Sequence, residues 1–261
     1  LADLPLEITT GTTLSSITAV LRGGRPGPAV LLRGDMDALP VVERTGLAFA
    51  ASNGAMHACG HDLHVAGLVG AAQLLAAHRD ELPGSVVFMF QPGEEGLGGA
   101  RHMIDEGVLD AAGERVIAAY GVHVMPGPRG TFETKPGPLM ASGNRLFVTV
   151  HGVGGHGSQA WSAVDPVSVL MEIGTALEVM ITRRFSVTDP VVLSVTQLAA
   201  SDAVNVIPSS AKLGATIRTL SAENVPLVGA YAARVAEHIA AAHGCTAEVV
   251  FEPYYPPTIN D

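Results

Sequence analysis

The chain has 261 residues, with 15 lysines and arginines against 25 aspartates and glutamates, so its formal net charge is −10. This balance argues against nucleic acid as a partner, because binding phosphates requires clustered cations. Apolar residues make up 48% and charged residues 15%, which excludes disorder and supplies a core. No stretch reaches the ~18 consecutive apolar residues of a membrane span. With two cysteines and no leader-like N-terminus, we expect a cytoplasmic protein with free thiols.

The first half of the chain alternates short apolar strands with helical patterns. Strands are predicted at Pro28–Leu32, at Ser85–Phe90 and within Arg115–Val124, and helices at 62–78 and 99–106. We expect Asp62 to cap the first of these helices. Strands separated by helices indicate a mostly parallel sheet covered on both faces. Functional residues of such sheets gather at the carboxyl ends of the strands, and each predicted strand runs into Asp, Glu or His.

The second half has a different organisation. A composition change at Lys135–Pro138 predicts a domain boundary. The elements after it follow the order strand, helix, strand, strand, helix, strand, which is typical of a ferredoxin-like sandwich. They are expected at 145–150, 165–184, 191–197, 211–219, 222–243 and 246–251. The predicted fold class is therefore α/β, with a mostly parallel-sheet domain over 1–137, a βαββαβ domain over 138–252, and a return into the first domain over 253–261.

The densest group of chemically active residues is the segment 57–64, His-Ala-Cys-Gly-His-Asp-Leu-His. Thiolate and imidazole are preferred ligands of borderline metals. Gly60 allows the tight backbone that two converging ligands need. A metal site is therefore favoured over the alternative, a loop with an inert buried cysteine and surface histidines.

Acidic residues and a further histidine follow the other predicted strands. Glu94 and Glu95 lie on a glycine-flanked loop, where one carboxylate could bind a metal while its neighbour acts as a general base. By itself, His123 at a strand end is more typical of a core residue, and only the other two clusters make it a candidate. Asp35 and Asp37 are candidate ligands, or groups that orient a histidine ligand.

Three more candidates lie in the second half. His156 is flanked by glycines that permit close approach to a ligand, although a flexible turn explains the pattern equally well. Arg218 could hold a carboxylate with two hydrogen bonds, or be a surface charge. Asn205 carries no signal of its own.

These segments occur in an order that resembles a known family, and the resemblance covers about residues 27–261. The segments are RGDMDALP, MHACGHD, QPGEEG, YGVHV, GVGGHGS, DPV, NVIP and TIRT. The family is the metal-dependent amidohydrolase and peptidase family that includes aminoacylase and carboxypeptidase G. The cysteine of HACGHD is similar to that of one branch, the hippurate hydrolases, N-acetyl-diaminopimelate deacetylases and auxin–amino acid conjugate hydrolases.

The resemblance implies a role for each candidate. Four residues match the ligands of a site for two divalent metal ions, manganese or zinc with cobalt or nickel as further candidates: Cys59, His61, Glu95 and His123. Glu94 matches the general base, and His156 matches a residue that supports the oxyanion in the partner subunit. Asn205 and Arg218 resemble residues that bind the substrate's carboxylate. The inserted domain of the family mediates a homodimer.

The activity that the resemblance implies is hydrolysis of the amide bond of N-acyl amino acids, either hippurate-like or N-acetylated. Family members extend further at both ends and carry another metal-binding histidine beyond this chain's last residue. The chain is therefore interpreted as a fragment or as a defective homologue. The alternative function is a truncated, non-catalytic homologue that dimerises and binds small molecules. A serine hydrolase is disfavoured because no G-x-S-x-G segment is present.

Overall fold

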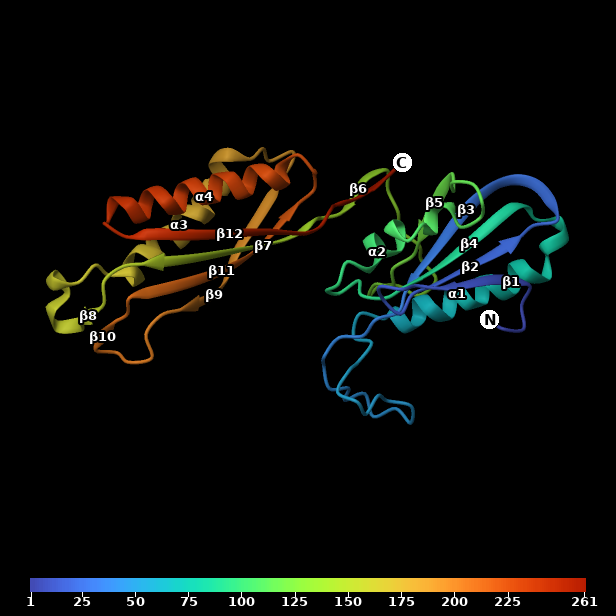
Figure 1. Cartoon of the computed structure of the whole chain (residues 1–261), viewed down its shortest axis with the longest axis horizontal. Coiled ribbons are helices and arrows are strands. Elements are labelled where there is room, and N and C mark those ends of the chain that lie inside the picture. Colours follow the sequence, from blue (N-terminus) through green and yellow to red (C-terminus); the bar gives the residue numbers. More distant parts are fainter. The chain divides into compact units, whose positions relative to one another are not determined.

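The computed structural model describes the whole chain, residues 1–261, as two compact units, Leu1–Thr131 and Phe132–Asp261 (Figure 1). The chain thus divides after residue 131, whereas the sequence favours a boundary after 137. Each unit has hydrophobic clusters of its own. None of the helices has the length and apolar character needed to cross a lipid bilayer.

The first unit is built on a five-stranded sheet with the order β1-β2-β4-β3-β5. Its strands are β1 (Leu6–Thr10), β2 (Ile17–Arg22), β3 (Arg25–Asp35), β4 (Pro83–Gln91) and β5 (Ala118–Gly121). β4 and β5 run parallel to β3, whereas β1 is antiparallel to β2 and β2 is antiparallel to β4. The three strands predicted from the sequence are parallel as expected, but the whole sheet is mixed, with two parallel and two antiparallel pairings. The N-terminal hairpin adds two antiparallel pairings that the strand–helix alternation does not include.

Both faces of this sheet are covered, as expected. Helix α1 (His61–Ala77) packs on one face, while helix α2 (Gly99–Asp105) and the 3₁₀ turn η2 (Val108–Asp110) pack on the other. A second 3₁₀ turn, η1 (Arg79–Glu81), follows α1. Alternate residues of β4 serve the two faces: Phe88 belongs to the cluster under α1, and Val87 and Met89 belong to the cluster under α2.

The start of α1 differs from the prediction. The helix begins at His61 and follows Gly60, whose φ of 85° lies in the left-handed region. A Cβ atom at Gly60 would also lie 2.5 Å from Cγ2 of Val124, so glycine is required there. The prediction that Asp62 caps the helix is wrong, because Asp62 lies inside the first turn and no side chain caps this end. A carboxylate in the first turn still interacts favourably with the helix dipole.

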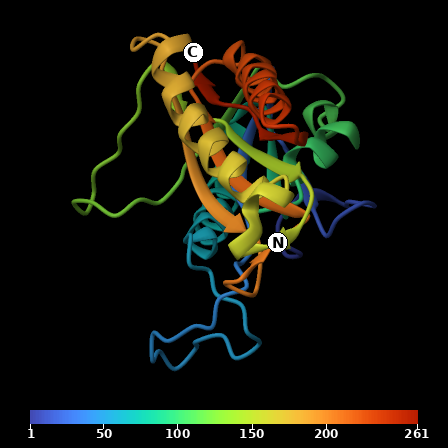
Figure 2. The same ribbon diagram turned by 90° about the vertical axis from the view of Figure 1, so that its left-hand side faces the viewer.

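The second unit has the strand and helix order expected from the sequence. Its main elements are β7 (Gly143–His151), α3 (Pro166–Arg184), β9 (Val191–Ala199), β11 (Ser210–Thr219), α4 (Asn224–Ala242) and β12 (Thr246–Tyr255). The sheet has the order β12-β7-β11-β9, and every pairing in it is antiparallel. Both helices lie on one face of the sheet (Figures 1 and 2). Asp165 caps α3, because its Oδ1 accepts a hydrogen bond of 2.9 Å from the N–H of Val167.

Two short strand pairs complete the second unit. β8 (Gly155–His156) pairs with β10 (Val206–Ile207), and the 3₁₀ segment η3 (Gly157–Ser162) follows β8. β6 (Gly137–Met140) pairs with β13 (Thr258–Asn260). Residues 253–255 continue β12, so the end of the chain contacts elements of this second unit.

Candidate metal centre

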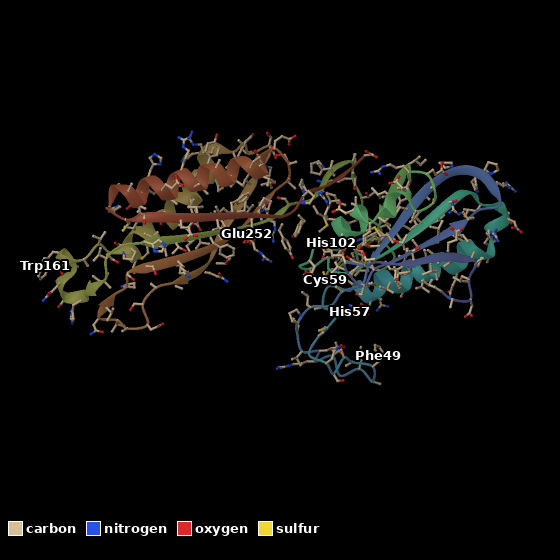
Figure 3. All side chains as sticks on the ribbon, in the orientation of Figure 1. Phe49, His57, Cys59, His102, Trp161 and Glu252 are labelled. Carbon is tan, nitrogen blue, oxygen red and sulfur yellow. The ribbon has the colours of Figure 1, made fainter.

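The metal-ligand candidates come together at the carboxyl ends of β3, β4 and β5. Figure 3 labels one of them, Cys59, in the first unit. Cys59 and His61 stand at the start of α1, Glu94 and Glu95 follow β4, and His123 follows β5. The ligand atoms of Cys59, His61 and His123 lie within 4.8 Å of one another, and so do those of His61, Glu94 and Glu95. The ligand atoms of Asp35, His61 and His64 form a third such group, so His61 belongs to all three groups and is the centre of the arrangement.

His61 presents an unpaired nitrogen to this centre. Its side chain is 1% exposed, and its Nδ1 lies 3.1 Å from the main-chain oxygen of Asp37. A carbonyl only accepts hydrogen bonds, so we assign the ring proton to Nδ1 and a lone pair to Nε2. This Nε2 is buried without a hydrogen-bond partner, 3.5 Å from Oδ2 of Asp35 and 3.9 Å from Oε2 of Glu94. A buried lone pair beside carboxylates is an arrangement that a divalent cation satisfies.

Asp37 positions two of the candidates. Its carbonyl oxygen contacts Nδ1 of His61, and its carboxylate accepts a hydrogen bond of 2.9 Å from the N–H of Glu95. Nδ1 of His57 lies 3.1 Å from the same carbonyl oxygen. Asp37 therefore connects the segment after β3 with the segment after β4 and with the start of α1.

Asp35 and His64 form a buried link beside the centre. The carboxylate of Asp35 contacts Nδ1 of His64 at 2.5 Å and Nη1 of Arg33 at 2.8 Å. Nε2 of His64 accepts a hydrogen bond of 2.9 Å from the N–H of Val124. Both nitrogens of His64 are thus occupied, and the ring connects α1 with the segment that carries His123. No separate role for His64 is predicted from the sequence, although its spacing of three residues from His61 places both on one helix face.

Burial and neighbouring charges shift the pKa values of three groups. Burial is the largest influence on Asp35 and raises its pKa, but the hydrogen bond from His64 and the charge of Arg33 bring that pKa below its ordinary value. Burial, with the charges of Glu95 and Asp35, raises the pKa of Glu94. Burial and Glu95 raise the pKa of Cys59 to about 11, so a metal ion must displace the thiol proton to bind there.

The ring of His123 is oriented by its own neighbour. Its Nδ1 lies 2.7 Å from the main-chain oxygen of Val124, which places the proton on that nitrogen. Its Nε2 faces Sγ of Cys59 at 3.5 Å. Both cysteines of the chain are free thiols, as expected.

Two of the three candidates of the second unit are neighbours, and the third lies far from them. His156 on β8 lies opposite Val206 on β10, and the carbonyl of Asn205 accepts a hydrogen bond of 2.9 Å from the N–H of Gly157. His156 and Asn205 are therefore neighbours near the start of β11. Arg218 is exposed near the other end of β11, roughly 25 Å away at the usual rise per residue. Its Nη1 donates to Oγ1 of Thr216 at 2.8 Å.

Comparison with known proteins gives consistent matches. Residues 31–261 match the sequence profile of Peptidase family M20/M25/M40. The chain is 41% identical to the N-acetylcysteine deacetylase of Bacillus subtilis, over 95% of the chain and 64% of that protein. It is 38% identical to the N-acyl-L-amino acid amidohydrolase of Geobacillus stearothermophilus, over 95% of the chain and 67% of that protein.

A solved structure of a protein from the same family superimposes on the chain. The YXEP protein of Bacillus subtilis, described as a dinuclear metal binding peptidase from the M20 family, superimposes with a TM-score of 0.80. It is 38% identical to this chain, and the match covers 98% of the chain and 66% of that structure. The chain therefore spans about two thirds of the length of these relatives, from 64% to 67%.

Proposed function

Because the chain belongs to Peptidase family M20/M25/M40, we propose that it is part of a metal-dependent amidohydrolase that cleaves the amide bond of N-acyl amino acids. The observation that carries this proposal is the buried Nε2 of His61, which has no hydrogen-bond partner and lies between the carboxylates of Asp35 and Glu94. The names of two relatives, an N-acetylcysteine deacetylase and an N-acyl-L-amino acid amidohydrolase, support the substrate class. Both N-acetylated and hippurate-like amino acids fall within it.

The residues present fit two divalent cations. We assign four of the converging side chains as ligands: Cys59, His61, Glu95 and His123. The thiol of Cys59 would lose its proton when it binds a metal ion. Thiolate and imidazole suit zinc, cobalt or nickel, and carboxylates permit manganese. Bound cations would polarise the substrate carbonyl and lower the pKa of a water molecule held beside them.

Glu94 is the proposed general base. It would take a proton from the attacking water and return it to the leaving amine. Burial, with the charges of Glu95 and Asp35, raises its pKa, which favours a carboxylate that can accept a proton and release it again. Asp37 and Asp35 would act only through other residues: Asp37 holds His61 and Glu95, and Asp35 holds His64.

The second unit would bind the substrate's charged end and the developing oxyanion. In this proposal His156 donates to the oxyanion, and Asn205 and Arg218 bind the carboxylate. Since Arg218 lies at the far end of β11 from the other two, one second unit cannot bring all three to one substrate. This separation supports a homodimer in which His156 and Asn205 of one copy act with Arg218 of the other.

The test is the variant Glu94→Gln. We expect elemental analysis to find unchanged metal content and turnover of N-acetyl and N-benzoyl amino acids to fall about 10²- to 10⁴-fold, the usual contribution of a general base. Glu178→Gln, which changes an exposed glutamate of α3, is the matched control and keeps full activity. Equal turnover in Glu94→Gln would remove Glu94 from the reaction. Metal binding without any turnover in the unaltered chain would favour the non-catalytic alternative.

A further inference from the structure

A pocket of about 380 Å³ lies beside the candidate metal centre, entirely within the first unit. Asp37 and Glu95 form one part of its wall. The remaining wall is largely apolar and includes Leu14, Leu39 and Leu97. A cavity of this volume is within the range of small-molecule sites.

Three separate segments build the wall. Leu14 comes from the connection between β1 and β2, Leu39 from the segment after β3, and Leu97 from the segment after β4. Gly93 lies between two of them with a φ of 67°. A Cβ atom there would be 2.8 Å from Cβ of Leu97 and 3.6 Å from Cδ1 of Leu14. The two leucines therefore lie close to a residue that has no side chain, and a larger residue at this position would collide with Leu97.

The wall that carries Leu14 is fixed in place by an acidic side chain. The carboxylate of Glu106, just after α2, accepts hydrogen bonds from the N–H of Thr12 at 3.1 Å, from the hydroxyl of Thr12 at 2.8 Å and from the N–H of Thr13 at 2.8 Å. These bonds tie the β1–β2 connection to the end of the helix that follows the Glu94–Glu95 segment. Because these bonds already order the β1–β2 connection, little ordering is needed when a ligand binds, and a rigid wall accepts only ligands of a suitable size.

The charges of the pocket indicate which half of a substrate it suits. Its lining contains two carboxylates and no lysine, arginine or histidine. A ligand carboxylate would be repelled there, whereas an uncharged apolar chain would bury its surface against the leucines. In an N-acyl amino acid, the acyl chain is bonded directly to the carbonyl carbon that is attacked. The acyl chain would therefore start next to Glu95, an assigned ligand.

We propose that this pocket binds the apolar acyl chain of the substrate, and that Leu14 and Leu97 set the chain length that is accepted. The identity of the substrate in this inference rests on the proposed amidohydrolase function. Each methylene that the pocket buries would improve binding of the acyl chain roughly fourfold.

The test compares acyl chains of increasing length on one amino acid: N-acetyl, N-butanoyl, N-octanoyl and N-benzoyl methionine. In Leu14→Trp the indole would fill the pocket, so kcat/KM for the octanoyl and benzoyl substrates falls at least tenfold relative to the acetyl substrate. Leu14→Ala has the opposite effect and shifts the preference towards longer chains. Leu74→Trp, at a leucine of α1 that is 69% exposed, is the matched control and keeps the original profile.

Other outcomes would overturn the inference. If kcat/KM in Leu14→Trp fell equally for all acyl chains, Leu14 would not determine which chain length is accepted. A second series, N-acetyl alanine, leucine and phenylalanine, must keep its relative rates in Leu14→Trp. If those rates change while the acyl profile does not, the pocket holds the amino-acid side chain instead.

A binding measurement separates this inference from the proposed function. Calorimetric titration of metal-loaded Glu94→Gln with N-acetyl and N-octanoyl methionine is expected to show tighter binding of the longer chain, and Leu14→Trp in the same background removes the difference. If the unaltered chain hydrolyses nothing yet this length dependence is present, the hydrolase proposal fails and the pocket assignment stands. If hydrolysis occurs without length dependence, the pocket assignment fails alone.

Discussion

The two units of the chain use buried polar groups in different ways. In the first unit, Asp35, His61 and His64 are buried at one end of the sheet, and Nε2 of His61 is left without a hydrogen bond. In the second unit, the hydroxyls of Ser142 and Thr219 are buried and hydrogen-bonded to each other at 2.8 Å. Oδ1 of Asn144 and Oγ of Ser221 are buried there without a hydrogen-bond partner, but all three groups of converging metal ligands lie in the first unit. The candidate residues of the second unit are all on its surface.

The converging ligands, rather than burial alone, indicate which unit would bind a group from outside the chain. A buried, unsatisfied polar atom costs about 1–3 kcal/mol, so a protein keeps one where something else pairs with it. The first unit would gain stability from a cation, because the cation replaces a missing interaction. The second unit has a continuous apolar core between two helices and a sheet, and its surface residues can change without loss of packing.

Removing core volume from the second unit is expected to have the largest effect on stability. Ile173 of α3 is fully buried against the sheet, and Ile173→Ala should lower the free energy of unfolding by about 2–5 kcal/mol, measured by urea denaturation. Met171→Ala, on the exposed side of the same helix, should change it by less than about 0.5 kcal/mol. Metal content per folded chain should stay the same in both variants. A loss of metal in folded Ile173→Ala would mean that the two units are not independent.

Removing the link through His64 is expected to have the next largest effect, measured as metal affinity per folded chain. In His64→Asn the contact with Asp35 and the hydrogen bond from Val124 are lost, so His123 is held less firmly. Residues that orient a ligand in this way usually contribute 10- to 100-fold to metal affinity, which competition with a chelator would measure. His78→Asn, just beyond the same helix, is the control. Unchanged affinity in His64→Asn would show that His123 is positioned without this link.

The smallest expected effect concerns Glu106 and depends on pH. Hydrogen bonds from Thr13 and Thr12 lower the pKa of this carboxyl from 4.5 to about 2. Its contribution to stability is therefore fully present above about pH 5 and is lost as the pH falls towards 2. Glu106→Gln should accordingly have a lower Tm than the unaltered chain at pH 6, with a difference that shrinks on acidification, as followed by circular dichroism. The exposed-site variant Glu237→Gln should show no such trend. A difference that is constant with pH would contradict the lowered pKa.

Local signals in the sequence were sufficient where they were strong. The Asp165–Pro166 start of α3 and the apolar strands of both sheets were predicted to within a few residues. The hairpin of β1 and β2 is not predicted, because β1 has exposed threonines and no apolar run, and the buried run of β2, Ala19–Leu21, is only three residues long. The cap of α1 was misassigned, since a left-handed glycine replaces the expected side chain.

The candidate site was predictable in its ligand types but not in its arrangement. Cys59 with His61, and Glu94 with Glu95, are local patterns, and parallel strand ends bring such patterns together. The link from Asp35 through His64 to Val124 joins three segments and has no local signature. The distance between Arg218 and His156 depends on the antiparallel register of β11, which spacing along the chain does not reveal. The roles of all these residues stay predictions.

The convergence of the candidate ligands has a consequence for the order of folding events. Cys59 and His123 are separated by 64 positions in the chain, and they approach only after β3 has paired with β4 and β5. A metal ion therefore has no complete site until the sheet exists, and it cannot act as a nucleus for folding. A cation that binds so late in the process leaves the folding rate almost unchanged and slows unfolding instead. The bound cation would therefore lengthen the lifetime of the native state.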